Sequence, residues 1–194
     1  GEGSQKSNTE FLVLAHPRIH FRNKTKNKPA NVILISLDTL RPDRLSSYGH
    51  PQATSPRLDL LGKKEGILFT ECYSHAPSTL PSHASVFSSL YPSEHGLNDP
   101  VSESHFPDDI ALLSETLKNN GYITAAFTGG AQVSAAYGFN RGFDLYNERY
   151  ANADKVVRQA EKWLKYNRKN SPFFLFLHTY QIHHPYQPPE HWSS

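Results

Sequence analysis

Apolar residues along the chain follow two recurring patterns, short continuous runs and longer stretches with a helical period. Continuous runs rich in β-branched, leucine and aromatic residues occupy positions 31–37, 67–73, 122–128 and 172–178. Runs of this kind predict strands that are buried on both faces of a parallel sheet. Helical periodicity lies at positions 56–66, 81–90, 107–121 and 153–170. Because strands alternate with amphipathic helices, we predict an α/β fold with a doubly wound, mostly parallel sheet flanked by helices.

Several residues predict where these helices begin and end and which of their sides faces the core. Pro56 can start the first helix and Gly66 can stop it, with the leucines between them facing the core. The segment 107–121 has an acidic first turn and Gly121 at its C-terminal cap position. In the segment 81–90, the apolar residues are expected to face inward and Tyr91 with Pro92 to end the helix.

Composition limits the classes of partner. With 20 basic and 18 acidic residues among 194, the formal net charge is +2, which does not favour nucleic acid or an anionic membrane surface as a partner. No apolar run approaches the roughly 18 residues that a membrane span needs. Cys72 is the one cysteine, so no internal disulfide can form.

The two ends of the chain differ in character from its middle. Residues 1–30 are basic and irregular and are expected to form an arm or linker, in which positions 1–8 read as a remnant of cloning or processing. Residues 31–194 are expected to form the amino-terminal part of a larger domain, because the sequence stops within a proline-rich loop.

Ligands of open parallel sheets bind beyond the carboxyl ends of the strands. That rule selects Asp38 after the first strand, the loop 74–82 after the second, Gly129 with Gly130 after the third, and the loop 178–184 after the fourth.

Thr79 lies just ahead of an expected helix N-terminus, where unpaired amides and the helix dipole favour an anion such as phosphate or sulfate. A threonine hydroxyl is a weak nucleophile unless a base or a metal activates it, and Asp38 could hold such a metal. The alternative is structural: Ser and Thr ahead of a helix commonly act as caps, and an Asp that closes a strand is often a turn residue.

Five segments, taken in order, resemble the amino-terminal half of the sulfatase family, within the alkaline-phosphatase-like superfamily. They are "ILISLDTLRPDRLSSYG", "APSTLPSHASVFSSLYPSEHG", "LKNNGYITAAFTGG", "GFNRGFDLY" and "FFLFLHTYQIHHPYQPP". The resemblance covers about positions 31–189 and implies that family's fold.

The resemblance assigns metal binding to Asp38 and places Thr79 at the family's nucleophile. Many sulfatases carry a second acidic residue where this chain has Thr39, which argues against a four-carboxylate calcium site. Family members oxidise a Cys or Ser at the nucleophile position to formylglycine, whereas oxidation of a threonine would yield a ketone. Thr79 therefore resembles the threonine nucleophile of phosphatase-like and phosphoethanolamine- or glycerophosphate-transferring relatives, which use zinc or manganese.

Other positions complete the expected site. His83 stands where the family has an arginine; it is expected either to serve the anion as a donor, acid or base, or to be a helix histidine bonded to backbone. His183 matches the histidine that contacts the sulfate or phosphate group. Gln132 lies where sulfatases carry a Lys-x-His pair. A histidine-only zinc site drawn from His178, His184 and His191 is the less favoured alternative.

We expect the full-length protein to be a metal-dependent hydrolase or transferase that acts on sulfate, phosphate or phosphonate esters through Thr79. The cofactor would be a divalent metal (Zn, Mn or Ca), and the partner a small-molecule, glycan or lipid ester. Alternatives are a sulfuric ester hydrolase without formylglycine and an inactive sulfatase-like binding module. The resemblance implies an extracytoplasmic location, either periplasmic or secreted, and a later segment that completes the metal site. Any membrane tether is expected to lie outside this chain. Without that segment, we expect the chain to be inactive.

Overall fold

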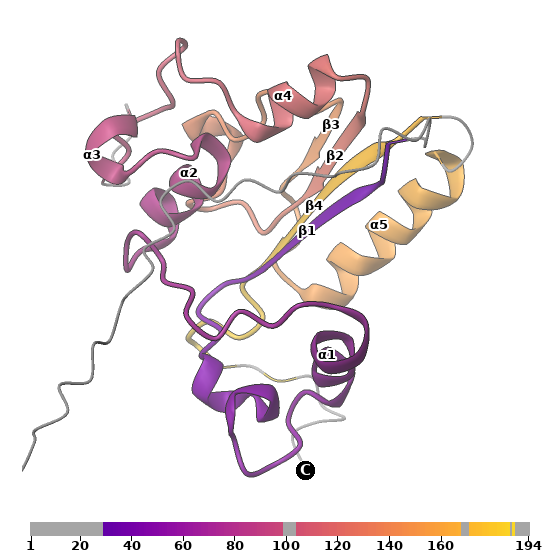
Figure 1. The fold of residues 1–194 in the computed structure, drawn as a ribbon. Helices are drawn as coiled ribbons and strands as arrows, with labels where there is room; N and C mark the ends of the chain where they lie inside the picture. Colours follow the sequence, from indigo (N-terminus) through magenta and orange to yellow (C-terminus); the bar gives the residue numbers. More distant parts are fainter. Residues whose placement is uncertain (1–28, 99–103, 168–170, 187, 189–194) are drawn as a thin grey trace, which may run out of the picture.

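The computed structural model describes residues 29–98, 104–167, 171–186 and 188. At its centre lies a parallel sheet of four strands (Figure 1). Along the sheet the strands are ordered β1 (Val32–Leu37), β4 (Phe173–Thr179), β2 (Ile123–Phe127) and β3 (Leu145–Asn147). Each neighbouring pair is parallel, and helices flank the sheet, so the predicted fold class is confirmed.

The α-helices of the described residues are α1 (Pro56–Leu60), α2 (Thr79–Ser88), α3 (Pro92–His95), α4 (Leu113–Asn119) and α5 (Ala153–Asn167). Shorter 3₁₀ turns lie at Pro42–Arg44, Ser46–Tyr48 and Ala135–Tyr137, and a π-helical turn at Leu61–Glu65 follows α1. One face of the sheet is covered by α5, and α2 and α4 lie on the other face (Figure 1).

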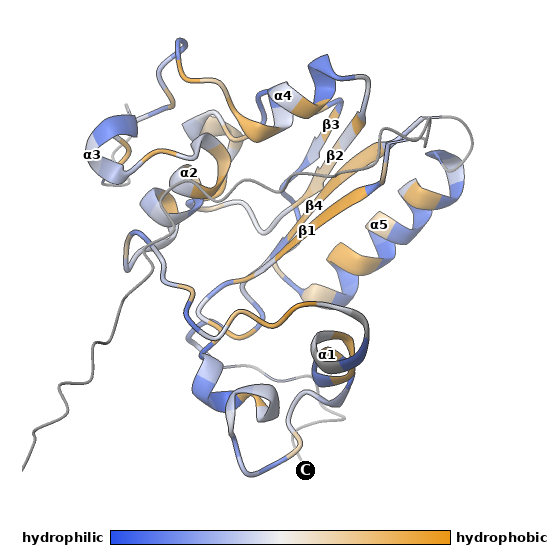
Figure 2. Ribbon diagram, in the orientation of Figure 1, coloured by the Kyte–Doolittle hydropathy of each residue, from blue (hydrophilic) through white to orange (hydrophobic). Residues whose placement is uncertain are grey.

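Two buried clusters fix these layers. On the α2 side, the ring of Phe87 stands edge-on to Phe139 and Phe176, with ring centroids 5.7 and 4.9 Å apart. On the other side, Val156 and Ala160 of α5 pack against the sheet, and the apolar stripe of that helix faces the strands (Figure 2). Burial of a large apolar side chain contributes about 1.5–3 kcal/mol. These clusters therefore hold the helices against the two faces of the sheet.

On the face of the sheet that α5 covers, β1 is less well covered than the other strands. Helix α5 packs on β4 and β2, whereas Ile33 and Ile35 of β1 are 50% and 60% exposed. Their neighbours Val32 and Leu34 point to the other face and pack on the larger cluster. Because side chains alternate along a strand, the two isoleucines share the α5 face of the sheet.

Helix α2 begins two residues before the predicted Pro81. Ser78 is the extended N-cap residue, and Pro81 is accommodated in the first turn, where its missing N–H has no partner to lose. The helix ends at Ser88, and the residue that caps it, Ser89, has a left-handed backbone with φ of 61°. Thr79 is therefore the first helical residue rather than a loop residue ahead of the helix.

The predicted strand at 67–73 is wrong: those residues lie outside the helices and strands of the structure. Ile67, Phe69 and Tyr73 are 80%, 65% and 79% exposed. Tyr48 Oη donates to the carbonyl oxygen of Phe69 at 2.9 Å, but the segment forms no ladder with a described strand. Strand propensity alone does not supply a pairing partner.

The expected inward face of the first helix is also wrong. The leucines at 58, 60 and 61 are exposed, and Asp59 is the buried residue of α1. Its carboxylate accepts hydrogen bonds from the backbone N–H of Ser47 at 2.9 Å and from the hydroxyls of Ser46 and Ser55. These local bonds turn the polar side of α1 toward the turn at residues 46–48.

Other differences concern the ends of elements. Helix α4 begins only at Leu113, after a turn that takes up the acidic residues, and Gly121 follows it with a positive φ of 84°. Sequence reasoning missed the three-residue strand β3. No helix among the described residues is long and apolar enough to cross a membrane. Almost all of the expected arm, and His191, lie outside the described residues.

Candidate active site

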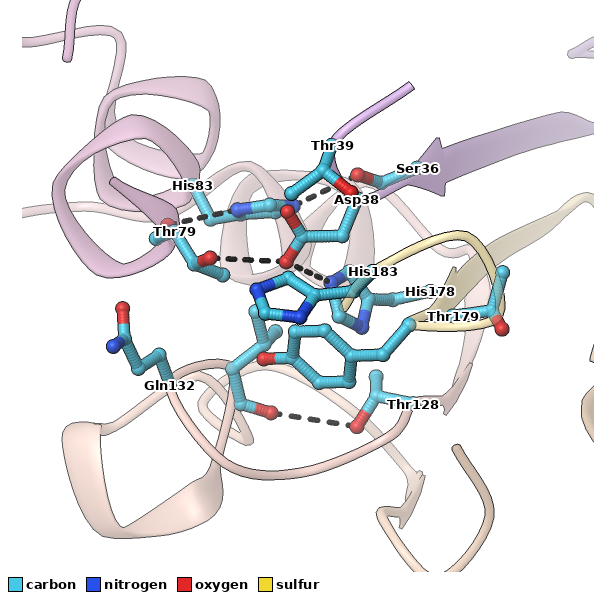
Figure 3. Close-up of polar contacts among 12 residues, drawn as sticks. Ser36, Asp38, Thr39, Thr79, His83, Thr128, Gln132, His178, Thr179 and His183 are labelled. Atoms are coloured by element: carbon cyan, nitrogen blue, oxygen red, sulfur yellow. Dashed lines mark hydrogen bonds and ion pairs between the residues drawn. The ribbon is translucent and has the colours of Figure 1, made fainter. Parts of the chain in front are cut away.

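Polar side chains from three elements meet at the carboxyl edge of the sheet (Figure 3). Asp38 follows β1, Thr79 opens α2, and His178 is the penultimate residue of β4. The backbone N–H of Asp38 donates to the carbonyl of Thr179 at 3.2 Å, which extends the pairing of β1 with β4 by one bond. The sheet register therefore sets where the Asp38 carboxylate stands.

Thr79 and Asp38 are in direct contact. The Thr79 hydroxyl, Oγ1, donates to Asp38 Oδ2 at 2.9 Å (Figure 3). Asp38 is buried, with 8% of its surface exposed. The structure thus brings together the predicted nucleophile and the predicted metal ligand, although they are 41 positions apart in the sequence.

The Asp38 carboxyl is held in its charged form. Burial by itself would raise its pKa, but His178 and the hydrogen bond from Thr79 outweigh burial, so the pKa lies below the ordinary value of 3.8. An ionised carboxylate is a hard oxygen donor, the type that divalent cations prefer.

His83 lies one turn after Thr79 and has partners for both ring nitrogens. Its Nδ1 is 2.8 Å from the Thr79 carbonyl oxygen, and Nε2 is 2.8 Å from Ser36 Oγ. A carbonyl only accepts, so Nδ1 carries the proton and Nε2 accepts from the serine hydroxyl. Burial, with a contribution from nearby His178, lowers the pKa of His83, so the ring is neutral. These contacts match the backbone-bonded alternative; a catalytic role for His83 stays a prediction.

His183 lies in the exposed loop after β4. Its Nδ1 is 2.6 Å from the His184 carbonyl, and its ring stands edge-on to Tyr180 with centroids 5.8 Å apart. Thr39 Oγ1 donates to the carbonyl of Ile182 at 3.1 Å, which ties this loop to the residue after Asp38. The predicted contact of His183 with substrate stays a prediction.

Thr39 carries backbone strain. Its φ is 61°, a left-handed conformation that is unusual for a β-branched residue. Strained residues often accompany functional sites, where the surrounding structure holds them in place. Here the strain lies next to Asp38 and is held in part by the bond to Ile182.

Gln132 reaches the same helix end from the loop after β2. Its Oε1 accepts from the backbone N–H of Leu80 at 3.0 Å, so one amide at the start of α2 already has a partner. The resemblance indicated only that Gln132 lies where sulfatases carry a Lys-x-His pair. The sequence signal that could have indicated a role for Gln132 was its position after the Gly129–Gly130 turn, at the carboxyl edge of the sheet.

The donor atoms fit part of a cation site. Asp38 Oδ2 and Thr79 Oγ1 offer two oxygen atoms 2.9 Å apart, one of them charged. Across the described ranges, no group of three or more His, Cys, Asp or Glu side chains could hold a metal ion, so His178, His183 and His184 form no such cluster. Further ligands would have to come from outside these residues.

Three further polar residues fasten loops of the fold. Arg141 donates to Glu115 and to backbone carbonyls of the turn before α4. Asp144 binds the backbone N–H of Thr124 and pairs with Lys118 at 2.8 Å. His95 is fully buried and its ring nitrogens contact Ser85 Oγ and the N–H of Leu97.

Comparison with solved structures shows the same fold. A protein in complex with its substrate D-glucosamine-2-N,6-O-disulfate gives a TM-score of 0.72 at 24% identity, over 83% of this chain and 36% of that one. Phosphonate monoester hydrolase of Agrobacterium radiobacter gives 0.67 at 18% identity, over 84% and 43%. The C-terminal periplasmic domain of EcEptC from Escherichia coli, in complex with Zn, gives 0.64 at 20% identity, over 88% and 49%.

Curated relatives are sulfatases. Arylsulfatase A of Bos taurus is 37% identical over 100 residues, which are 50% of this chain and 20% of that protein. N-acetylglucosamine-6-O-sulfatase of Bacteroides thetaiotaomicron is 25% identical over 213 aligned positions, covering 96% of this chain and 38% of that protein. The chain thus spans well under half the length of these relatives. The family model described as Sulfatase matches residues 30–194, and the chain therefore belongs to the sulfatase family.

Proposed function

We propose that the full-length protein is a metal-dependent ester hydrolase or transferase whose nucleophile is Thr79. The observation that carries this proposal is the 2.9 Å hydrogen bond from Thr79 Oγ1 to Asp38 Oδ2, at the start of α2 and the carboxyl edge of the sheet. A capping threonine would bond to the amides of its own helix, whereas this hydroxyl is directed at a buried carboxylate.

The reaction is an in-line displacement. The bond from Thr79 Oγ1 to the sulfur or phosphorus forms while the bond to the ester's alcohol oxygen breaks, and that oxygen takes up a proton from water. Before attack the Thr79 hydroxyl donates to Asp38 Oδ2; on attack its proton passes to water, and Asp38 stays a carboxylate. Water or an acceptor alcohol then cleaves the threonine ester and restores the hydroxyl.

Asp38 and Thr79 would hold the divalent cation. When bound, the cation lowers the pKa of a coordinated hydroxyl and stabilises negative charge on the ester oxygens. The chain's own residues orient these two ligands: the β1–β4 register places Asp38, and the Thr79 carbonyl is held by His83. His183, from the loop after β4, would contact a nonbridging oxygen through Nε2, because Nδ1 faces the His184 carbonyl. To donate there, the ring must carry protons on both nitrogens.

Substrate and location follow by analogy with relatives. Sulfated sugars and phosphonate monoesters are named for structural neighbours, so we propose a sulfate, phosphonate or phosphate ester of a glycan, lipid or small molecule. The zinc of one periplasmic neighbour supports a zinc or manganese cofactor and an extracytoplasmic location. These assignments are proposals for the complete protein.

The test is to trap the intermediate. The full-length protein is incubated with zinc or manganese and with 4-nitrophenyl sulfate, 4-nitrophenyl phosphate or a phenylphosphonate monoester, then quenched in acid and analysed by peptide mass spectrometry. We expect a sulfuryl, phosphoryl or phosphonyl adduct on Thr79 with one of these esters. Thr79→Val should lower turnover at least about 1,000-fold, as removal of a nucleophile does.

Ser88→Ala is the matched control. Its hydroxyl donates to the carbonyl of Ala84 and accepts from the N–H of Leu90, both at the far end of α2 from Thr79, so turnover should stay close to wild type. Equal turnover by Thr79→Val and wild type would contradict the assignment of the nucleophile.

An inactive binding module is the second candidate, and one contact favours it. Gln132 replaces a basic pair and occupies the Leu80 amide, which lowers the capacity of this helix end to hold an anion. Binding of a sulfated ligand with no turnover of any ester, and no adduct on Thr79, would decide for this alternative.

A further inference from the structure

His178 is the most deeply placed polar residue of the site. It precedes Thr179 at the end of β4, pairs in register with Ser36 of β1, and is fully buried, with 0% of its surface exposed. Its ring stands edge-on to those of His83 and Tyr180, with centroids 5.0 and 4.6 Å apart. The imidazole thus lies directly beneath the Asp38 carboxylate in the core of the domain (Figure 3).

Unlike the other buried histidines, His178 has no hydrogen bond. His83 and His95 each use both ring nitrogens. Among the described residues, the only buried side-chain nitrogen or oxygen atoms without a hydrogen-bond partner are Nδ1 and Nε2 of His178. A buried polar group left without a partner costs about 1–3 kcal/mol, so a purely structural residue here would be better apolar.

The group that Nε2 faces identifies its role. Nε2 lies 3.6 Å from Asp38 Oδ2, the same oxygen that accepts from Thr79 Oγ1. This separation is longer than an N–H···O hydrogen bond, and a displacement of less than 1 Å would close it. When Thr79 gives up its proton as nucleophile, Oδ2 loses that donor and needs another.

We propose that His178 is a positioning residue whose Nε2–H donates to Asp38 Oδ2 and fixes the carboxylate for the divalent cation. The inference rests on the proposed function only in taking Asp38 as a metal ligand. Outer groups that hydrogen-bond to ligating carboxylates commonly change metal affinity 10–100-fold when they are removed. His178 would act in this way through Asp38 and touch neither the cation nor the ester.

The first test measures metal affinity rather than turnover. The metal-free full-length protein is titrated with zinc and with manganese against a chromogenic chelator, for wild type, His178→Gln and His178→Leu. Glutamine places an amide N–H near the position of Nε2, whereas leucine offers none. We expect His178→Leu to bind the cation about 10–100-fold more weakly and His178→Gln to stay within about threefold of wild type.

His95→Leu is the control, because His95 is equally buried and its ring nitrogens bond to Ser85 and Leu97 rather than to Asp38 or Thr79. It should lower the melting temperature and leave metal affinity unchanged. Equal affinities of wild type and His178→Leu, loss of affinity in His178→Gln as large as in His178→Leu, or a wild type that binds neither cation would overturn the proposal.

A second test needs no variant. In the long-range ¹H–¹⁵N spectrum of metal-loaded protein labelled at histidine, Nε2 of His178 should carry a proton, as a donor must. An unprotonated Nε2 would overturn the proposal, because the ring would then be a ligand itself or an acceptor. Both readouts are independent of turnover: weakened metal binding in His178→Leu with no ester cleaved by wild type would retain this inference and reject the proposed function.

Discussion

Gln132 Oε1 accepts a hydrogen bond of 3.0 Å from the backbone N–H of Leu80, the residue after Thr79. This bond joins the loop after β2 to the first turn of α2. It also gives a partner to an amide that an anionic ester at the helix end would otherwise use. The Gln132 carboxamide therefore borders the place where the charge of the substrate would lie.

Substitutions of Gln132 should separate helix stability from anion binding. Gln132→Ala removes one hydrogen bond and should lower the free energy of unfolding by about 0.5–1.5 kcal/mol. Gln132→Glu keeps an acceptor and adds a charge favourable to a helix N-terminus, so stability should be retained. The same charge should repel an anionic ester and lower kcat/KM at least about tenfold. Urea unfolding and steady-state kinetics measure the two effects, and an unchanged kcat/KM in Gln132→Glu would place the anion elsewhere.

Substitutions of Thr39 should change both the backbone strain at that position and the mobility of the loop that contains His183. Thr39→Ala and Thr39→Gly both remove the hydroxyl that holds Ile182, but only glycine relieves the left-handed φ of 61°. The glycine variant should therefore be about 1–2 kcal/mol more stable than the alanine variant. In both, amide hydrogen exchange at residues 180–186 should quicken, whereas Thr39→Ser should resemble wild type. Unchanged exchange in Thr39→Ala would show that the hydroxyl does not hold the loop.

Two glycines with positive φ should respond very differently to alanine. A Cβ at Gly142, with φ of 75°, would lie 2.3 Å from the backbone nitrogen of Glu115 in α4, whereas a Cβ at Gly49, with φ of 98°, meets no atom within 4 Å. Gly49→Ala should cost only the backbone strain of about 1–2 kcal/mol. Gly142→Ala must also displace α4 and should cost more than about 3 kcal/mol. Urea denaturation of both variants tests this order, which equal losses would contradict.

The Asp144 carboxylate should make stability depend on pH. Its partial burial would raise its pKa, but the Lys118 ion pair and the bonds from Thr124 outweigh burial, so the pKa lies below 3.8 in the folded state. A lowered pKa stabilises the fold at pH values above 3.8, and this contribution is lost as pH falls through the folded value. Asp144→Asn should therefore be less stable than wild type at pH 7, with the difference shrinking toward pH 3. Urea unfolding across this range is the measurement; a constant difference would contradict it.

Much of the fold was predictable because its strong signals are local. The apolar runs at 31–37, 122–128 and 172–178 became β1, β2 and β4, and the amphipathic period of α5 placed that helix within a few residues. The segment 67–73 has an equally apolar composition, yet strand formation needs a partner, which composition does not encode. The leucines of α1 wrongly predicted its buried side, because three hydrogen bonds to Asp59 decide which side of that helix is buried.

The sequence allowed the residues of the candidate site to be predicted, but not the contacts between them. The rule for ligands of parallel sheets selected Asp38 and the loop after β4. It also selected the loop 74–82, which contains Thr79, but through a strand at 67–73 that does not form; the resemblance then singled out Thr79. The backbone-bonded alternative for His83 agrees with its contact to the Thr79 carbonyl, but nothing in the sequence indicates that His83 also bonds to Ser36, since that bond depends on how α2 crosses the sheet. His178 was named only as one of several histidines, because the lack of hydrogen bonds to its ring is a property of packing.

The uncovered isoleucines of β1 have a consequence for any experiment on this chain in isolation. Within the described residues β1 is an edge strand, and edge strands offer unpaired backbone groups to other chains. Ile33 and Ile35 add exposed apolar surface to it, and β1 contains no lysine or proline that would hinder pairing with another strand. Concentrated samples should therefore self-associate and precipitate, and activity assays on such samples would measure aggregated protein. Work at low protein concentration, or with Ile35→Lys as a solubilising change, avoids that artefact.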